Sequence, residues 1–412
     1  MIRGKNIVCL AMSPWEGDYM KASVQIMSVL ARHNRVIYVE YQFTYKDIIT
    51  GMLRGNGIPV KRILGINKRL RTIKLEDNTE INVLTAPPIY PVNWLPSGKI
   101  HHFFVKRNAR ILRKAIQRAV GSRDMHSPIV VNAFNPTYGL PLVGKLNEKL
   151  LLYYCYDEIS HAKWCKKHGT GVEADFAAKA DAIITTSAQL QQNKKVYNDQ
   201  CFLVKNGVNL ELFQQAYAQK QAADATDKPL TVGYLGTIDD RLDYELLAHC
   251  IEQLPDAQFH FVGREIYPQG KDRLKNYSNV TFFGAQSPDK LAGYVAKFDI
   301  GLIPFVSNGF TQSIYPLKIN EYLAAGLPVV MTNFGQVDDF REIASITSQP
   351  DEFLVAIKQL AAHIKQPEAY TQATKERLAF AASNSWDNRA EELSEVINQI
   401  IARKKTEFQK TY

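Results

Sequence analysis

Short, continuous apolar runs that alternate with helical patterns are the feature of this sequence that most restricts its fold. They lie at residues 6–13, 35–42, 128–135, 149–158, 181–187, 201–208, 230–236, 257–263, 279–284, 299–305 and 327–332. Runs of this length, separated by helices, are typical of parallel strands that are covered on both faces. The chain has 412 residues, which is long enough for two domains with separate cores. The sequence therefore predicts an α/β protein with two Rossmann-like domains, each built on a doubly wound sheet.

We place the domain boundary in the polar, Ala-rich segment that follows Asn206-Gly207, a pair suited to a tight turn. This gives a first domain at 1–210, a second at 211–380 and a C-terminal amphipathic helix at 381–412. Residues 43–128 are the least regular part of the first domain. We interpret them as an insertion in which a Pro-rich connection joins two basic helical stretches, KRILGINKRLR and VKRNARILRKAIQR.

Positive charge is concentrated in the first domain. The net charge is +9, but residues 51–120 alone hold 14 Lys and Arg against 3 Asp and Glu. A basic amphipathic helix of this kind attracts anionic lipid head groups. It could equally be a solvated helix that packs through its apolar stripe. Nucleic-acid binding is disfavoured because no recognition motif accompanies the charge.

The cysteines and the start of the chain bear on the expected location. Five cysteines form no C-x-x-C pair and are odd in number, which favours reduced thiols in a cytosolic protein. The first apolar run is too short for a spanning segment or a signal peptide, and no run of 18 apolar residues occurs. We expect a cytoplasmic protein that is peripheral on the inner face of the plasma membrane.

Residues 311–333, TQSIYPLKINEYLAAGLPVVMTN, have the pattern of a ligand site beside a buried strand. Pro316 fixes φ where a helix begins and Gly326 supplies its left-handed stop. Lys318 and Glu321 are three residues apart on that helix and therefore share a face. The ammonium and the helix N-terminus could bind a diphosphate, while the carboxylate could accept hydrogen bonds from a ribose diol. A plain i,i+3 Lys–Glu pair on a solvated face is the alternative.

From Pro316 to Val330 this segment resembles the Pro-Leu-Lys-x-x-Glu-Tyr-x-Ala-x-Gly-x-Pro-Val-Val motif of bacterial glycosyltransferases with the GT-B fold. The resemblance implies that Lys318 binds the diphosphate and Glu321 the ribose of a UDP- or GDP-linked sugar. Many retaining members carry another Glu eight residues before the ribose-binding one, where this chain has Ser313. The stereochemical outcome therefore cannot be carried over.

The same resemblance implies two Rossmann-like domains that face each other across a cleft, with the C-terminal helix crossing back to the first domain. It suggests a hexosyltransferase of the exopolysaccharide or teichuronic-acid type, which acts in cell-envelope biosynthesis. The expected acceptor is a lipid-linked sugar or a polysaccharide. No Asp-x-Asp motif is present, so we expect transfer without a metal ion and without a cofactor.

Further residues of the second domain are candidates for nucleotide-sugar contacts. Gly236 allows close approach of the backbone, and Thr237 is expected to add a hydroxyl at a helix N-terminus. Arg264 follows a strand and could neutralise the diphosphate or form a surface ion pair. Phe283 and Gly284 end the next strand, where related proteins contact the base. Thr311 and Pro316 complete the candidate set, and Ser313 holds the position of the missing sugar contact.

In the first domain the candidates are carboxylates at the expected carboxyl edge of the sheet. Asp157 is our choice for the base that an inverting reaction requires. Glu158, His161 and Asp18 are the reserves, and in a retaining reaction Asp157 would only orient the acceptor. Trp15, Glu16 and Asp18 could line an acceptor cleft. Asp18, Asp157 or Glu158 could instead cap the helix that follows.

Two other functions share these features. A nucleotide-sugar epimerase or a phosphorylase could use the same fold and the same nucleotide contacts. A non-catalytic protein that binds a nucleotide or a glycan is compatible with Ser313, although the presence of both Lys318 and Glu321 weighs against it.

Overall fold

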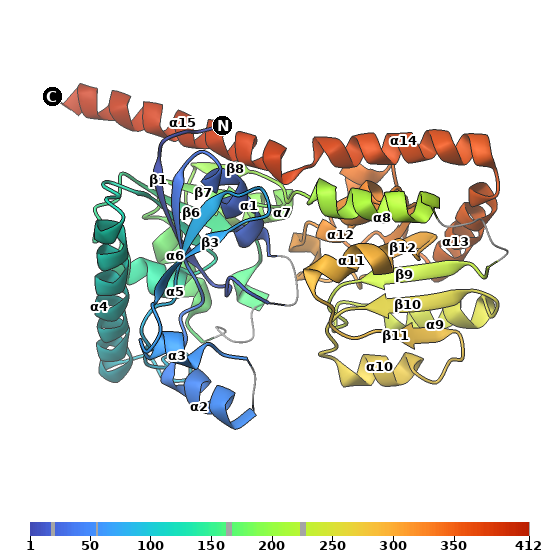
Figure 1. The fold of residues 1–412 in the computed structure, drawn as a ribbon, viewed down its shortest axis with the longest axis horizontal. Helices are drawn as coiled ribbons and strands as arrows, with labels where there is room; N and C mark the ends of the chain where they lie inside the picture. Colours follow the sequence, from blue (N-terminus) through green and yellow to red (C-terminus); the bar gives the residue numbers. More distant parts are fainter. Residues whose placement is uncertain (18–20, 55–56, 162–166, 223–227, 412) are drawn as a thin grey trace. The chain divides into compact units, whose positions relative to one another are not determined.

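The computed structural model describes residues 1–17, 21–54, 57–161, 167–222 and 228–411 (Figure 1). The chain forms two compact units. The first consists of Met1–Glu16, Lys21–Lys205 and Arg389–Tyr412, and the second contains Asn206–Asn388. Both are α/β units with a Rossmann-like parallel sheet, as the alternating apolar runs predict. The chain passes from the first unit to the second between Lys205 and Asn206, a few residues before the expected boundary.

The first unit contains an eight-stranded sheet of order β3-β4-β2-β1-β5-β6-β7-β8. Its strands are β1 (Asn6–Ala11), β2 (Arg35–Val39), β3 (Leu70–Lys74), β4 (Glu80–Leu84), β5 (Ile129–Ala133), β6 (Leu150–Cys155), β7 (Ala182–Thr185) and β8 (Cys201–Leu203). Only the edge pair β3 and β4 is antiparallel. β1 is central, with Val8 in register with Ile37 on one side and Val130 on the other. The apolar runs are buried because helices cover both faces.

The helices of this unit are α1 (Ala22–Ala31), α2 (Tyr45–Arg54), α3 (Val60–Ile63), α4 (Lys99–Ser122), α5 (Pro136–Gly139), α6 (Gly169–Ala177) and α7 (Ala188–Lys195). Short 3₁₀ turns, η1 (Leu140–Leu142) and η2 (Ile159–His161), complete it. The expectation for 43–128 is partly wrong. VKRNARILRKAIQR lies in α4, but KRILGINKRLR is not one helix, because its first residues form α3 and its last residues begin β3. Pairing of β3 with β4 extends the sheet and overrides the helical pattern.

The second unit contains a six-stranded, fully parallel sheet of order β11-β10-β9-β12-β13-β14. Its strands are β9 (Thr231–Leu235), β10 (Gln258–Val262), β11 (Val280–Phe282), β12 (Ile300–Ile303), β13 (Val329–Thr332) and β14 (Ser345–Thr347). The edge strand β14 was not expected, because its sequence Ser-Ile-Thr holds one apolar residue and forms no apolar run. One large apolar core fills this unit.

The helices of the second unit are α8 (Leu210–Ala222), α9 (Tyr244–Gln253), α10 (Pro268–Leu274), α11 (Leu291–Val295), α12 (Leu317–Ala324), α13 (Pro350–Ile364) and α14 (Pro367–Ser383). Its 3₁₀ turns are η3 (Pro288–Lys290), η4 (Thr311–Ser313) and η5 (Asp338–Phe340).

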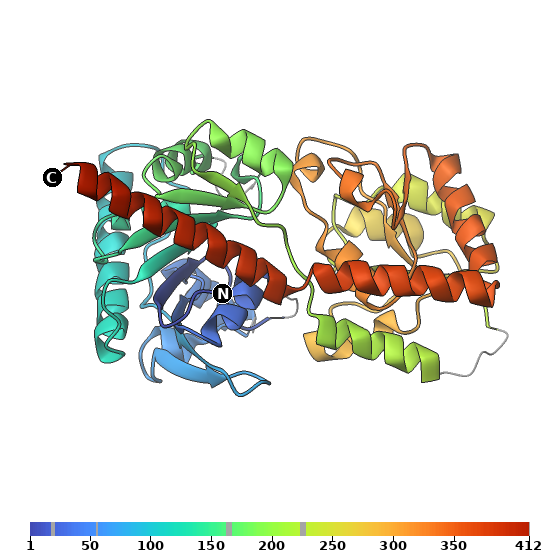
Figure 2. The ribbon, with the colours of Figure 1, turned by 90° about the horizontal axis from the view of Figure 1, so that it is seen from above.

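The long C-terminal helix α15 (Trp386–Thr411) joins the first unit from Arg389 onward. Figure 2 shows it (red) lying along that unit. Its inner face buries Leu393 and Ile397, and the Lys404 ammonium lies 2.6 Å from the carboxylate of Asp181. Neither this helix nor any other described one combines the length and hydrophobicity that crossing a membrane requires.

Candidate functional site

Helix α12 of the second unit carries the two residues on which the sequence interpretation rests. It begins after Pro316, its N-cap residue, as the sequence predicts. It ends in a complete Schellman motif: the N–H of Leu327 donates to the carbonyl of Tyr322 at 2.9 Å, and that of Gly326 to Leu323 at 3.0 Å. Gly326 has φ +71°, the left-handed conformation that this motif requires. The helix is thus fixed at both ends by local sequence.

Tyr322 holds α12 against the sheet. Its hydroxyl accepts a 2.7 Å hydrogen bond from the Leu235 N–H at the end of β9, and it lies 3.4 Å from the Leu302 carbonyl of β12. Gly301 makes this contact possible, because a Cβ there would lie 2.6 Å from the Tyr322 ring. Since Tyr322 faces the sheet, Lys318 and Glu321 lie on another face, and both are partly exposed.

The Lys318 side chain extends over the loop that follows β9. Its Nζ lies 5.7 Å from the centre of the Tyr234 ring and 5.8 Å from that of Phe305. It runs so close to Gly236 that a Cβ there would lie 2.0 Å from Cε and 2.6 Å from Nζ. Within the described part of the chain, neither the Lys318 nor the Glu321 side chain has a hydrogen-bond or ion-pair partner. The ammonium is therefore positioned by packing and not by an anion of the protein.

A second cation, Arg241, contributes to the same site and was missed at the sequence level. Its guanidinium lies 5.5 Å from the centre of the Phe305 ring and binds both carboxylate oxygens of Asp239 at 2.6–2.9 Å. The signal for it was a cation five residues after Gly236, in the loop that follows the first strand of the domain. Aromatic rings and a carboxylate together hold this guanidinium in place.

The electrostatics of Lys318 and Glu321 suit an anionic ligand. Burial and the nearby charge of Arg241 lower the pKa of Lys318 to about 8, although Glu321 and Asp239 oppose the shift. Burial also raises the pKa of Glu321 to about 7, against the attraction of Lys318. A bound diphosphate would offset the excess of positive charge and stabilise the ammonium form of Lys318.

The affinity for a nucleoside diphosphate is expected to fall as the pH rises above about 8, the pKa of Lys318. The sign follows from linkage: an anion favours the protonated amine, so binding retains a proton that the free site loses. The fall should approach, but not exceed, about tenfold per pH unit, the limit for one proton. Isothermal titration calorimetry with UDP and GDP across the alkaline range measures it. A pH-independent affinity would contradict the assignment, and Lys318→Met should abolish the dependence.

Gly236→Ala is expected to weaken nucleoside diphosphate binding about tenfold, a loss of ~1.4 kcal/mol that corresponds to one weakened charged contact. The new Cβ would displace the Lys318 side chain, and φ at this position is +144°. Gly144→Ala is the control, because its φ is +70° and its Cβ would meet nothing within 4 Å. Equal affinities for the two variants would show that Gly236 does not position Lys318.

The expectation that Thr237 lies at a helix N-terminus is wrong. Helix α9 begins only at Tyr244, and Asp243 caps it by accepting the N–H of Leu246 at 2.9 Å. Thr237 instead lies in the loop after β9, where its carbonyl accepts the Tyr234 hydroxyl at 2.9 Å. Its partly exposed side chain remains beside Gly236, so it stays a candidate contact without a helix dipole.

The other strand-end candidates lie where the sequence places them. Arg264 is exposed, and its carbonyl accepts the Ile238 N–H at 2.8 Å. Phe283 follows β11 and packs edge-on against His260 at 5.1 Å. Gly284 has φ +68° and accepts the Gly263 N–H at 2.9 Å. These contacts order the carboxyl edge of the second sheet.

Thr311 and Ser313 are both buried in the turn before α12. The Thr311 hydroxyl donates to the Val306 carbonyl at 2.6 Å and accepts the Asn308 N–H at 3.0 Å. The Ser313 hydroxyl donates to the Gly309 carbonyl at 3.3 Å. The Thr311 side chain therefore folds this loop, which argues against its direct reach to a nucleotide.

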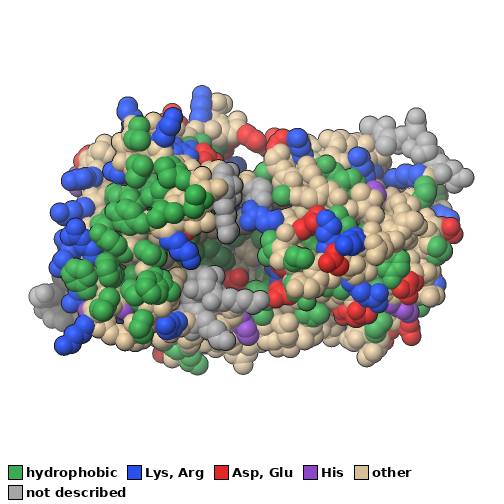
Figure 3. Space-filling view, turned by 90° about the horizontal axis from the view of Figure 1, so that it is seen from below, with side chains coloured by type: hydrophobic (Ala, Val, Ile, Leu, Met, Phe, Trp, Pro, Cys, Tyr) green, Lys and Arg blue, Asp and Glu red, His purple; other side chains and the backbone are tan. Residues whose placement is uncertain are grey.

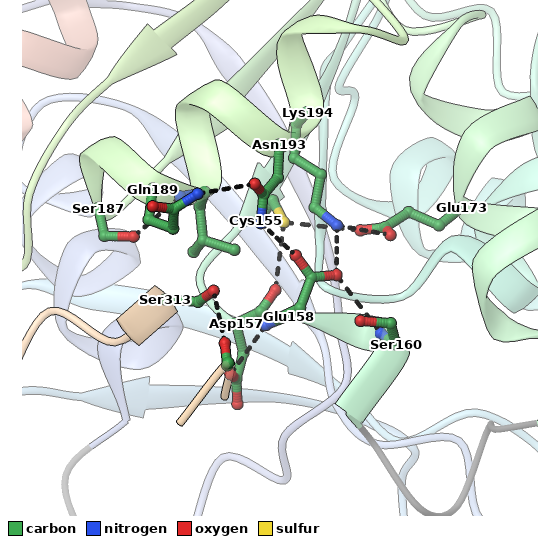
Figure 4. Close-up of polar contacts among 12 residues, drawn as sticks. Cys155, Asp157, Glu158, Ser160, Glu173, Ser187, Gln189, Asn193, Lys194 and Ser313 are labelled. Carbon is green, nitrogen blue, oxygen red and sulfur yellow. Dashed lines mark hydrogen bonds and ion pairs between the residues drawn. The ribbon is translucent and has the colours of Figure 1, made fainter. Parts of the chain in front are cut away.

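In the first unit, Asp157 and Glu158 follow β6 as expected but have different environments (Figure 4). The Asp157 carboxylate accepts the backbone N–H of Glu158 at 2.9 Å, and the residue is partly exposed. The Glu158 carboxylate is buried, 2.7 Å from the Lys194 ammonium and 3.1 Å from the Asn193 amide. Lys194 also contacts Glu173 at 2.8 Å.

This ion network changes the interpretation of Glu158. Burial would raise the pKa of its carboxyl group, but the Lys194 ammonium outweighs burial and holds it below the ordinary value. At Glu173 burial prevails and the pKa is raised. Because both Glu158 oxygens already have partners on α7, we withdraw it as a reserve base and as a substrate contact, and assign it to the packing of α7.

The first loop of the chain is only partly described. The backbone N–H of Trp15 donates to the buried Glu40 carboxylate at 3.1 Å, and the Trp15 ring packs edge-on against Tyr38 at 5.1 Å. Glu16 forms ion pairs with Arg62 at 3.1 Å and Arg71 at 2.5 Å. Asp18 lies outside the described residues. His161 ends η2 and is exposed.

No group of three or more His, Cys, Asp or Glu side chains suited to a metal ion occurs among the residues that the structure describes. The adjacent pair Asp239 and Asp240 does not form such a group, and the carboxylate of Asp239 is bound by Arg241.

Comparison with known proteins relates this geometry to a family. Residues 229–366 match the profile of the glycosyl transferases group 1. The chain is 33% identical over 171 residues to TuaH of Bacillus subtilis, whose name describes a glycosyltransferase of teichuronic acid biosynthesis. It is 26% identical over 146 residues to the sulfoquinovosyl transferase SQD2 of Arabidopsis thaliana. These alignments cover 39% and 34% of this chain, and 42% and 28% of the relatives' own lengths.

The fold is shared with solved structures over nearly the whole chain. Sucrose-phosphate synthase from Thermosynechococcus elongatus superposes with a TM-score of 0.68 at 18% identity, covering 97% of this chain and all of that one. HepE of Anabaena, solved with UDP and glucose, superposes with a TM-score of 0.60 at 13% identity, covering 96% and 100%. The chain therefore has the GT-B fold, and its residues 229–366 match the profile of the group 1 glycosyl transferases.

Proposed function

We propose that this protein is a glycosyltransferase that moves a sugar from a nucleotide-sugar donor to a lipid-linked acceptor, without a metal ion. The observation that carries the donor half is the Lys318 site. The Lys318 ammonium and the Glu321 carboxylate lie on one face of α12, and Arg241 is a second cation beside them. Within the described residues, the side chains of Lys318 and Glu321 have no hydrogen-bond or ion-pair partner. A diphosphate and a ribose diol match these two groups.

The main requirement of the reaction is to stabilise the leaving group. The acceptor oxygen forms a bond to the anomeric carbon, and the bond from that carbon to the diphosphate oxygen breaks. Negative charge therefore grows on the diphosphate, next to Lys318 and Arg241. Preorganised cations at that position stabilise the transition state more than the bound donor. The two side chains would supply the charge that a metal ion supplies in other transferases.

The acceptor proton has to leave, and we assign its removal to Asp157 if the sugar configuration inverts. Asp157 follows β6 at the carboxyl edge of the first sheet, where ligands of α/β folds bind. If the configuration is retained, the leaving diphosphate oxygen takes the proton and Asp157 only orients the acceptor hydroxyl.

An apolar groove in the first unit supports a lipid-linked acceptor over a free polysaccharide. It has a volume of about 440 Å³ and lies between α4 and the β3–β4 edge of the sheet. Leu70, Leu84, Pro87, Ile111, Ala115 and Ala119 line it. Its ionisable residues are Arg69, Lys114 and Arg118, all cationic. Apolar walls with a cationic rim match a hydrocarbon chain that ends in phosphate. A peripheral position on an anionic membrane would bring the enzyme to such an acceptor.

UDP is the first nucleoside diphosphate to test, because HepE, which shares the fold, was solved with UDP and with UDP-glucose. A thermal-shift screen of nucleoside diphosphates and nucleotide sugars identifies the donor, since a bound ligand stabilises the fold by mass action. A transfer assay then compares lipid-phosphate-linked and water-soluble sugar acceptors in a buffer containing a chelator. Activity that requires added metal, or that prefers the water-soluble acceptor, would contradict the respective part of the proposal. Nucleotide binding without any product would favour a non-catalytic protein, and isomerised donor without transfer an epimerase.

A further inference from the structure

Large hydrophobic side chains are exposed almost exclusively in one part of the first unit. Of the 12 such residues in the described chain, nine lie between residues 45 and 103. They are Tyr45, Ile49, Met52, Leu53, Leu64, Ile66, Trp94, Ile100 and Phe103, which we call the apolar surface. Leu53 is 81% exposed, Ile66 71% and Trp94 67%. Scattered exposure of this kind is normal for single residues, but its concentration in one segment indicates a binding surface.

The helix α2 shows how the sequence builds this exposure. Tyr45, Ile49, Met52 and Leu53 follow the spacing i, i+4, i+7, i+8 and therefore form one stripe. Ile48, which borders this stripe, is instead buried in a small separate core with Phe43 and Ile63. That core attaches α2 and α3 to each other and leaves the four residues of the stripe exposed.

Aromatic contacts connect α2 with the start of α4. The ring of Tyr45 lies 5.3 Å from that of Tyr90, which lies 5.0 Å from Phe104, and Phe104 lies 5.4 Å from Phe103. Figure 3 shows hydrophobic side chains gathered on this face of the first unit (left half) with Lys and Arg around them. Segments far apart in the sequence thus present apolar side chains together.

The charges around the apolar surface are mostly positive. Residues 48–75 and 81–123 contain 15 Lys and Arg and no Asp or Glu. Lys46, Lys61, Lys68, Lys99 and Lys106 are exposed among the apolar residues. The nearby acidic residue Asp47 uses its carboxylate to accept the N–H and the hydroxyl of Thr44, at 2.7 and 2.8 Å.

We propose that the apolar surface inserts into the interface of an anionic lipid bilayer, with the surrounding lysines on the phosphates. Exposed Trp and Tyr settle at head-group depth, aliphatic side chains enter the acyl boundary, and cations pair with anionic lipids. Complete absence of carboxylates over two segments favours phosphate-bearing lipid over a protein partner of mixed charge. The inference extends the peripheral location in the proposed function to a defined surface and a mode of attachment.

Sedimentation of the full chain with phosphatidylglycerol–phosphatidylcholine vesicles, without nucleotide, tests this surface. The wild type should bind, more weakly at high salt but not with complete loss, because apolar insertion is not screened. Met52→Ser/Leu53→Ser should lower the partition coefficient about tenfold or more, the effect of removing two partly inserted apolar side chains. Val196→Ser/Val355→Ser is the matched control, since these are also exposed apolar residues but lie outside the apolar surface. Its binding should equal that of the wild type.

Three results would overturn the inference: no vesicle binding, equal losses in the two double variants, or complete loss of binding in high salt. Light scattering tests the alternative that a second copy of the chain binds the apolar surface. A wild-type dimer that becomes monomeric in Met52→Ser/Leu53→Ser would assign the surface to self-association. Unchanged thermal stability and nucleotide binding in both variants exclude misfolding. A protein that binds vesicles but transfers no sugar would contradict the proposed function and leave this inference standing.

Discussion

Lys318→Met should lower kcat/KM for sugar transfer by about 10²–10³-fold, which corresponds to ~2.7–4 kcal/mol of transition-state stabilisation, the effect of removing one oxyanion-type donor. Methionine keeps an unbranched apolar stem over Tyr234 and Phe305, so the packing of this region is largely retained. What is lost is the ammonium, whose pKa of about 8 leaves it mostly protonated at neutral pH. Initial rates at saturating acceptor, with the donor concentration varied, give the effect.

The distribution of the loss between kcat and KM adds a second test of the Lys318 assignment. An ammonium that stabilises the departing diphosphate should lower kcat, because that charge develops only in the transition state. An ammonium that only anchors the donor should raise KM and leave kcat unchanged. Lys358→Met is the control, because Lys358 is an exposed lysine on α13 of the same unit. If Lys318→Met turned over as fast as wild type, the diphosphate would have to be bound elsewhere.

The α12 region could be predicted because its signals are local. Pro316, Gly326 and the i,i+3 spacing of Lys318 and Glu321 lie within one short segment, and each has a direct structural meaning. The strands were predictable for a similar reason, since a continuous apolar run needs no partner to be recognised. The edge strand β14, with the sequence Ser-Ile-Thr, contains no such run.

What the sequence did not reveal depends on contacts between distant residues. Glu158 meets Lys194 only because the segment after β6 folds against α7, so its buried ion pair spans 36 residues. KRILGINKRLR divides between α3 and β3 because β4 offers an edge for pairing. Arg241 is recognisable only when Phe305 is seen beneath it. Thr237 was misplaced because the loop after β9 is longer than the usual short turn between a strand and its helix.

Asp157 and Glu158 are adjacent carboxylates after β6, and substituting each in turn separates an effect on catalysis from an effect on stability. Glu158→Gln breaks a buried ion pair with Lys194 and leaves that ammonium with fewer acceptors. It should therefore lower the free energy of unfolding by ~3–5 kcal/mol, the usual effect of removing one partner of a buried pair. Thermal and denaturant unfolding measure this loss. A Glu158→Gln protein as stable as wild type would contradict the packing role assigned to Glu158.

Asp157→Asn should show the opposite behaviour. In the wild type the Glu158 N–H donates to the Asp157 carboxylate at 2.9 Å, and the asparagine oxygen can still accept this hydrogen bond. The free energy of unfolding should therefore change little. If Asp157 is the base of an inverting reaction, kcat should fall about 10²–10⁴-fold, the usual contribution of a general base. Nucleoside diphosphate affinity should remain that of the wild type, because the Lys318 site lies in the other unit.

The anomeric configuration of the product, determined by NMR, decides what the Asp157→Asn result means. Inversion together with a large loss of kcat supports the base. Retention together with a small loss assigns Asp157 to orientation of the acceptor, with the leaving diphosphate as proton acceptor. Inversion with undiminished kcat would exclude Asp157 and direct attention to His161, the other described reserve after β6. An equal loss of catalysis and nucleotide binding would show instead that the substitution disturbs the fold.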